Sequence, residues 1–274
     1  MKHLFIVSLV FVGAVVPADE ALARADLPLW EFGVGAGGIS QQAYPGADEQ
    51  VGRAALLPYV VYRGKVLRAD SDGAGLRAIR TEGFELDVSL AGSLSSRGDS
   101  LKARAGMSRL HTLVEIGPVA RWFLNGRDAV HRITFELPVR GVFDARDLSR
   151  HRGLTLEPKL SLDHQVRGGW SYGLSASLLI GDERLGSTFY AVAPAEVLPG
   201  RRAYDAQAGL IAWRLNSRVF RQLTPDLRLF AFCRLDSVAG GANRGSPLVR
   251  KTTGASAGVG LIYTLKRSAA RASN

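Results

Sequence analysis

The chain has 274 residues, with 35 Lys and Arg against 25 Asp and Glu, a net charge of +10 and 46% hydrophobic residues. These values are ordinary for a folded protein and indicate neither intrinsic disorder nor a nucleic-acid-binding tail. A single cysteine, Cys233, excludes an internal disulfide framework and a cysteine zinc site. Glycine, at 31 of 274 residues, exceeds its usual share of about 7%. This composition favours strands and turns over helices.

Residues 1–25 have the features of a cleaved secretory signal peptide. Lys2 supplies a positive start, residues 4–16 form an apolar run, and Ala21, Ala23 and Ala25 suit the cleavage positions. The run is shorter than the roughly 20 residues that an uncleaved anchor needs. Residues 26–274 contain no apolar stretch long enough for a transmembrane helix, so we expect one exported domain, either soluble in the periplasm or a membrane β-barrel.

Period-two alternation dominates the exported part. From residue 84 the even positions, such as Leu86 and Val88, are apolar, whereas the odd positions, such as Glu85 and Asp87, are polar. The same pattern recurs over residues 130–143, 154–166, 170–180, 227–235 and 257–265. The alternation predicts that Leu86, Val88, Leu90, Ile133, Phe135, Leu160 and Leu178 face lipid.

The length of these runs separates a membrane barrel from a soluble β-sandwich. Sandwich strands average about 5 to 6 residues, whereas a tilted strand that spans an outer membrane needs about 9 to 11. Polar segments at residues 95–100, 125–128 and 239–247 separate the runs, and Asn125-Gly126 is a strong hairpin turn. We predict an all-β fold: a closed antiparallel transmembrane β-barrel of about 12 strands, with 10 as the next choice.

Several segments resemble one known family. The opening residues 30–35, the Tyr44-Pro45-Gly46 turn and residues 57–62 are similar to the start of the MltA-interacting protein (MipA/OmpV) family of outer-membrane proteins. Weaker matches are residues 83–85, 104–107, 114–118, 189–192 and 246–249, with Gly200 and Tyr204. The resemblance covers essentially the whole chain after the signal peptide. The basic tail from Lys266 to Asn274 departs from the aromatic residue on which most such barrels end.

The resemblance implies an outer-membrane barrel that acts as a non-catalytic structural or scaffold protein between murein-synthesising and murein-cleaving enzymes. Alternatives are a narrow porin-like channel for small solutes and a surface adhesin. The expected partners are outer-membrane lipid, lipopolysaccharide and peptidoglycan-remodelling enzymes, with no nucleic acid.

The sequence offers no convincing catalytic, cofactor-binding or metal-binding residues. Gly33, Gly35 and Gly38 satisfy a dinucleotide-binding spacing, but a turn follows them instead of a helix. Neighbouring residues in a strand face opposite sides, so neither Asp163 nor Ser161 is expected to reach His164. A serine on a strand beside His131 remains an open alternative.

The other polar and aromatic residues fall into three groups. Acidic and basic side chains on the polar faces predict a charge network inside the barrel, from Glu85, Asp87, Glu115, Glu136, Glu157, Asp163, Arg121, Arg132, Arg140 and Lys159. Aromatic residues near strand ends predict an interfacial girdle of Trp30, Trp122, Trp170, Trp213, Tyr59, Tyr62, Tyr172 and Tyr263. Basic loops contain Arg146, Arg150, Arg152, Arg201, Arg202, Arg244, Arg250 and Lys251.

Overall fold

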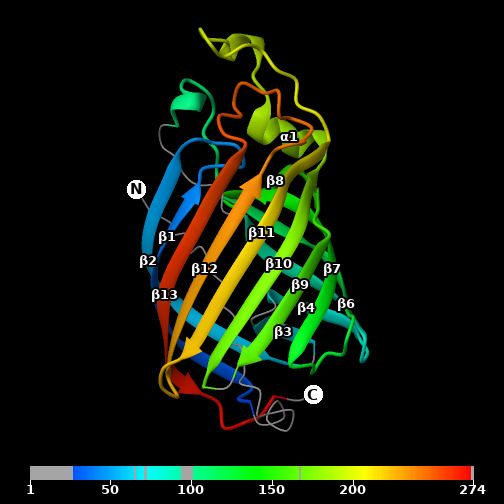
Figure 1. Cartoon of the computed structure of the whole chain (residues 1–274), viewed down its shortest axis with the longest axis vertical. Coiled ribbons are helices and arrows are strands. Elements are labelled where there is room, and N and C mark those ends of the chain that lie inside the picture. Colours follow the sequence, from blue (N-terminus) through cyan, green and yellow to red (C-terminus); the bar gives the residue numbers. More distant parts are fainter. Residues whose placement is uncertain (1–26, 65, 71–72, 94–100, 167, 273–274) are drawn as a thin grey trace.

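A computed structural model describes residues 27–64, 66–70, 73–93, 101–166 and 168–272 (Figure 1). The predicted signal peptide and the polar segment 95–100 lie outside these residues. The strands are β1 Trp30–Gln42, β2 Gln50–Arg63, β3 Leu67–Asp70, β4 Gly73–Arg80, β5 Phe84–Ser93, β6 Leu113–Phe123, β7 His131–Asp144, β8 Asp147–Leu156, β9 Lys159–Val166, β10 Trp170–Gly181, β11 Gly209–Gln222, β12 Leu227–Ser237 and β13 Thr253–Arg267. Within the described ranges, the loops contain one helix, α1 Glu183–Tyr190, and two 3-10 turns, η2 Lys102–Arg104 and η3 Pro194–Glu196.

The strands form one antiparallel sheet that closes on itself. Consecutive strands pair around the ring, β13 pairs with β1, and β10 pairs with β11. β8 and β9 share one position between β7 and β10, because the register that pairs Val139 with Leu156 continues unbroken to Glu136 and Lys159. Pro158 divides them because proline has no backbone N–H for the ladder. The 13 strands therefore fill 12 positions, which confirms the predicted barrel of about 12 strands.

The wall is weakest beside β2. The β3–β4 hairpin is short, and β2 pairs with β3 only at Tyr62 and Arg63. Among the described residues, no strand lies along the rest of that edge of β2. Leu56, midway along β2, has 73% of its surface exposed.

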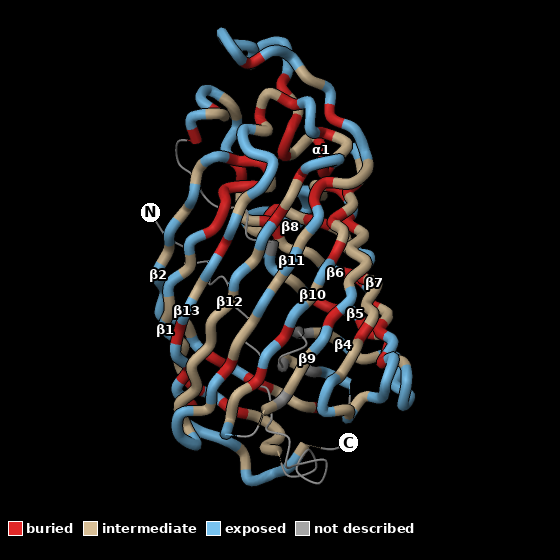
Figure 2. Tube along the Cα trace, viewed as in Figure 1, coloured by how far each residue is buried: buried red, intermediate tan, exposed pale blue. Residues whose placement is uncertain are grey.

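The two faces of the wall differ in polarity as the alternation predicts. Val88, Leu90 and Leu160 are exposed on the outside, while Leu86, Ile133, Phe135 and Leu178 are half-buried on the same face. Figure 2 shows the change between exposed and buried positions along the strands. Glu85, Asp87 and Arg121 are buried inside. Of the proposed girdle, Trp122, Trp213, Tyr172 and Tyr263 are exposed. The placement of Tyr59 in the girdle is wrong, because this side chain is buried among Val61, Ile262 and Phe230.

The two ends of the barrel differ in the length of their connections. The end that carries α1, which we call the α1 end, has long loops after β1, β5, β10 and β12. The opposite end, which we call the terminal end, has short turns and both ends of the described chain, where the Ala272 N–H donates to the Leu27 oxygen at 2.8 Å. Because outer-membrane barrels have short periplasmic turns and longer extracellular loops, the terminal end faces the periplasm.

The basic tail continues the wall at the terminal end. β13 extends past Leu265 to Arg267, and Pro28 forms a bridge with Arg271. The backbone N–H of Leu29 donates to the Ala270 oxygen at 2.8 Å. Among the described residues, no helix is long and apolar enough to cross a membrane.

The outer face can be tested with Val88→Arg at the middle of β5. We expect this variant to lower the free energy of unfolding in lipid by about 2 to 4 kcal/mol, because the charge would lie in hydrocarbon. Chemical denaturation of the refolded barrel measures the change. Leu148→Arg, beside the turn at residues 145–146, is the control and should cost less than about 1 kcal/mol. Equal costs at the two positions would contradict the assignment of the membrane-facing band.

Candidate functional site

A hydrophobic core of folded loops covers the α1 end of the barrel. We call this structure the plug and define it as residues 43–49, 101–112, 182–208 and 238–252. Its buried side chains include Ala43, Tyr44, Ala47, Leu101, Leu110, Leu185, Phe189, Tyr190, Val192, Ala206, Val238 and Leu248. They pack against Leu113 of β6, Val142 of β7 and Ile211 of β11. Because these strands and the β1–β2 loop lie on different sides of the ring, the core spans the mouth.

Hydrogen bonds between distant segments fasten the plug. The Tyr44 hydroxyl donates to the Leu248 oxygen at 2.7 Å, and the Tyr190 hydroxyl donates to the Pro45 oxygen at 2.9 Å. The Ser246 hydroxyl donates to the Tyr190 oxygen at 2.7 Å. Burial raises the pKa of Tyr44 to about 12 and also raises the pKa of Tyr190. Both phenols therefore remain neutral donors at physiological pH.

Helix α1 supplies the central apolar residues of the plug. The Asp182 carboxylate accepts a hydrogen bond from the Leu185 N–H at 2.9 Å and so caps the helix. Leu185 and Phe189, four residues apart, share its buried face. The period-two alternation along the chain did not indicate this helix. The signal that could have revealed it is Asp182 followed by apolar residues at helical spacing.

Two arginines join separate loops within the plug. Arg104 donates to the Phe189 oxygen at 3.0 Å, and Arg201 donates to the Ala103 oxygen at 3.1 Å. Arg201, one of the residues of the basic loops, is only 7% exposed and is therefore not a solvated loop charge. Its guanidinium stabilises loop carbonyls instead.

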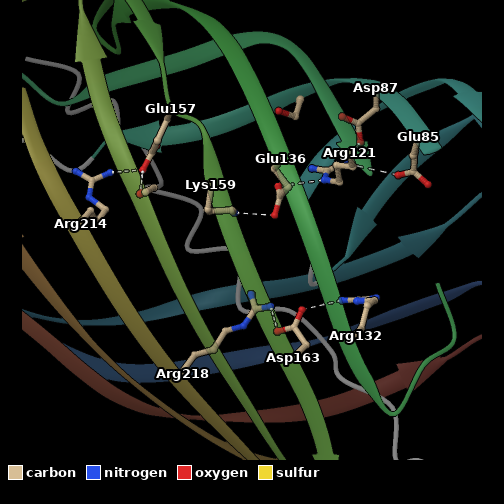
Figure 3. Close-up of polar contacts among 12 residues, drawn as sticks. Glu85, Asp87, Arg121, Arg132, Glu136, Glu157, Lys159, Asp163, Arg214 and Arg218 are labelled. Atoms are coloured by element: carbon tan, nitrogen blue, oxygen red, sulfur yellow. Dashed lines mark hydrogen bonds and ion pairs between the residues drawn. The ribbon is translucent and has the colours of Figure 1, made fainter. Parts of the chain in front are cut away.

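Inside the barrel, the predicted charge network is present and its acidic groups are paired. The middle layer centres on Arg121, which contacts Asp87 at 2.5 Å and Glu136 at 3.2 Å (Figure 3). Lys159 lies 2.9 Å from the other Glu136 oxygen, and Glu85 lies 2.6 Å from Arg127. Opposite charges on neighbouring strands thus neutralise one another away from lipid.

Two further layers lie on either side of the middle one. Toward the terminal end, Asp163 bridges Arg132 at 3.1 Å and Arg218 at 2.6 Å. Toward the plug, Arg214 bridges Glu157 at 3.0 Å and Asp236 at 2.8 Å. Figure 3 shows that the labelled side chains of these pairs lie side by side along the wall, on neighbouring or next-but-one strands.

His131 and His164 lie on the opposite face of the wall from Ser161, which is close to His164 in the sequence. His131 and His164 pair across β7 and β9, and their rings stack with centroids 4.1 Å apart. Ser161 is buried on the opposite, inner face, and Asp163 lies inside with its arginines. The cross-strand neighbour of His131 is therefore His164. In the described part of the chain, no group of three or more His, Cys, Asp or Glu side chains could hold a metal ion.

The closed ring, apolar exterior and ion-paired lumen define an outer-membrane β-barrel. The chain belongs to the family described as MltA-interacting protein MipA, whose model matches residues 34–265. This match confirms the resemblance and the outer-membrane location.

Curated proteins include no match to the chain. Solved structures give weaker similarities. A NanC porin is 10% identical with a TM-score of 0.41, over 85% of this chain and 100% of that chain. A bacterial polysaccharide outer membrane secretin is 9% identical with a TM-score of 0.39, over 86% and 99%. A Pseudomonas aeruginosa FadL homologue is 10% identical with a TM-score of 0.34, over 93% and 96%.

The middle layer predicts a large effect for Arg121→Met. This change leaves buried Asp87 without its 2.5 Å partner, so we expect a loss of about 3 to 5 kcal/mol in the free energy of unfolding. Adding Asp87→Asn should recover part of that loss in a double-mutant cycle. Arg150→Met is the control, since Arg150 pairs with Asp147 on the surface. A change at Arg150 as large as that at Arg121 would contradict the assigned role of the lumen.

The plug predicts a late tyrosine titration. The unfolded chain ionises its tyrosines near pH 10, whereas Tyr44 in the folded plug keeps its proton until about pH 12. The contribution of this proton to stability is complete below pH 10 and decreases as the pH rises toward 12, by about 3 kcal/mol in total. Ultraviolet absorbance of tyrosinate measures the titration, and Tyr44→Phe should remove a late step. An unchanged profile in that variant would refute the burial of Tyr44.

Proposed function

We propose that this protein is a non-catalytic scaffold of the outer membrane that binds a murein-remodelling enzyme at its periplasmic face. The observation that carries the proposal is the plug. A core that spans the extracellular mouth and is fastened by hydrogen bonds suits a stable anchor better than an open pore. The family description, which names an interaction with MltA, supports the choice of partner.

The lumen also favours a scaffold over a porin-like channel. Its charged groups contact one another at 2.5 to 3.6 Å and so occupy the sites that a passing ion would use. Paired in this way, they hold strands β5 to β12 in register. A rigid barrel of this kind can present its loops and turns in fixed positions.

The terminal end is the surface we assign to the enzyme. It carries exposed basic residues, including Arg221, Lys266 and Arg267, on the side that faces the periplasm, where murein lies. Arg221 lies over the Trp170 ring with its guanidinium carbon 4.8 Å from the centroid, which fixes one of these charges in place. Basic groups held at this rim would attract an acidic enzyme surface.

A binding measurement tests the scaffold directly. Surface plasmon resonance with a purified murein-degrading transglycosylase should detect binding to the refolded barrel. The double reversal Arg221→Glu/Lys266→Glu should weaken binding at least about tenfold, because two attractive charges become repulsive. The matched control Arg244→Glu/Lys251→Glu, in the plug at the other end, should bind like the wild type. Failure of the wild type to bind, or equal loss in both variants, would refute the proposal.

Conductance in planar bilayers separates the scaffold from the channel. We expect no stable ohmic current from the wild-type barrel, because the plug covers its mouth. A steady conductance that Arg214→Met or Arg121→Met changes would show that ions pass through the lumen and would replace the scaffold with a channel.

A further inference from the structure

A cavity of about 160 Å³ lies inside the barrel, directly beneath the plug. Tyr44, Leu185 and Phe189 of the plug line it on the α1 side. Its other lining includes three acidic and three basic side chains, namely Glu115, Glu157, Asp236, Arg140, Arg214 and Arg234. The cavity therefore combines an apolar roof with walls that carry equal numbers of positive and negative charges.

Four of these charged groups form ion pairs with one another. Arg214 contacts Glu157 at 3.0 Å and Asp236 at 2.8 Å. Arg234 lies 3.0 Å from the second Asp236 oxygen. The two Arg214 contacts are close in length to strong charge-assisted hydrogen bonds, so Arg214, Glu157 and Asp236 have little capacity left for a ligand, whereas the Nε of Arg234 has no hydrogen-bond partner among the described residues.

Glu115 and Arg140 are held much more loosely. Their closest charged atoms are 3.6 Å apart. The other contacts of Arg140 run from its Nε and Nη2 to the Ser89 hydroxyl at 3.4 and 3.3 Å. Strong pairs of this kind are shorter, at about 2.7 to 2.9 Å. A carboxylate and a guanidinium thus line the same cavity with hydrogen-bonding capacity that their mutual contact does not use.

We propose that this cavity binds a small zwitterion of the amino-acid class, with its carboxylate on Arg140 and its ammonium group on Glu115. A ligand with a single negative charge would meet three carboxylates, and one with a single positive charge would meet three guanidinium groups. A zwitterion complements both members of the loose pair and adds no net charge to a buried site. A cavity of about 150 Å³ can hold benzene, so the volume suits a ligand of about six heavy atoms.

The apolar roof of the cavity determines which ligand side chain fits. Leu185 and Phe189 would contact a short aliphatic side chain and would leave a charged or extended one without a polar partner. This inference is independent of the proposed scaffold, which uses the terminal rim instead.

Isothermal titration calorimetry of the refolded full-length barrel in detergent tests the site. Alanine is the probe, and propionate and ethylamine are its single-charge analogues. We expect alanine to bind at one site per barrel and each analogue to bind at least about tenfold more weakly, since each lacks one of the two ion pairs. No heat with alanine, or equal binding of an analogue, would overturn the proposal.

Two variants add a change of specificity that a misfolded protein cannot mimic. Arg140→Gln and Glu115→Gln should each weaken alanine binding at least about tenfold. Glu115→Gln should also improve propionate binding relative to alanine, because it removes a repulsive carboxylate and leaves Arg140 in place. Arg132→Gln, in the lumen but outside the cavity, is the matched control and should bind alanine like the wild type. Wild-type alanine binding by both cavity variants, or its loss in Arg132→Gln, would refute the assigned pair.

Discussion

The need to pair backbone N–H and C=O groups within lipid governs this structure, except along the edge of β2 that no described strand covers. It requires β10 to pair with β11 and β13 with β1, so the ends of the sheet meet. It also explains why β8 and β9 keep one register across Pro158. At Gly33 the closure needs a residue without a side chain, because a Cβ there would lie 2.1 Å from the Tyr263 oxygen. The glycines of β1 that imitate a dinucleotide-binding motif thus belong to the seam of the barrel.

Closure of the barrel gives each strand one face toward lipid and one toward the lumen. The alternation of apolar and polar residues in the sequence indicates this difference most clearly. Alternation along β5 placed Val88 outside and Asp87 inside, and the structure agrees. The lumen network could be predicted as a class, because charges turned away from lipid must find partners within the barrel. The actual pairs could not, since they depend on stagger between strands. Tyr59 shows the limit: an aromatic residue near a strand end suits either an interfacial girdle or an inner core, and alternation alone does not separate them.

The alternation pattern could not predict the plug, because the contacts of the plug join residues far apart in the chain. Tyr44 and Leu248 are 204 positions apart, and Tyr190 and Pro45 are 145 apart. Yet most of the segments outside the strands that carry the family resemblance, including Tyr44-Pro45-Gly46, residues 189–192 and residues 246–249, meet in this core. The resemblance therefore identified the residues of the plug without indicating that they touch. A period-two pattern describes a wall, whereas a cap made of loops has no period to detect.

Burial beneath the plug also determines which ion pairs of the lumen can stabilise the barrel. A buried ion pair gains little net stability unless its geometry is close and its remaining hydrogen-bonding groups are satisfied. Arg214 meets that condition by bridging two acids beneath the plug. Arg140 and Glu115 do not, although the same apolar roof lies over them. The long contact between Arg140 and Glu115, in the same cavity as shorter ion pairs, is explained better by a ligand that binds both side chains than by a role in stabilising the wall.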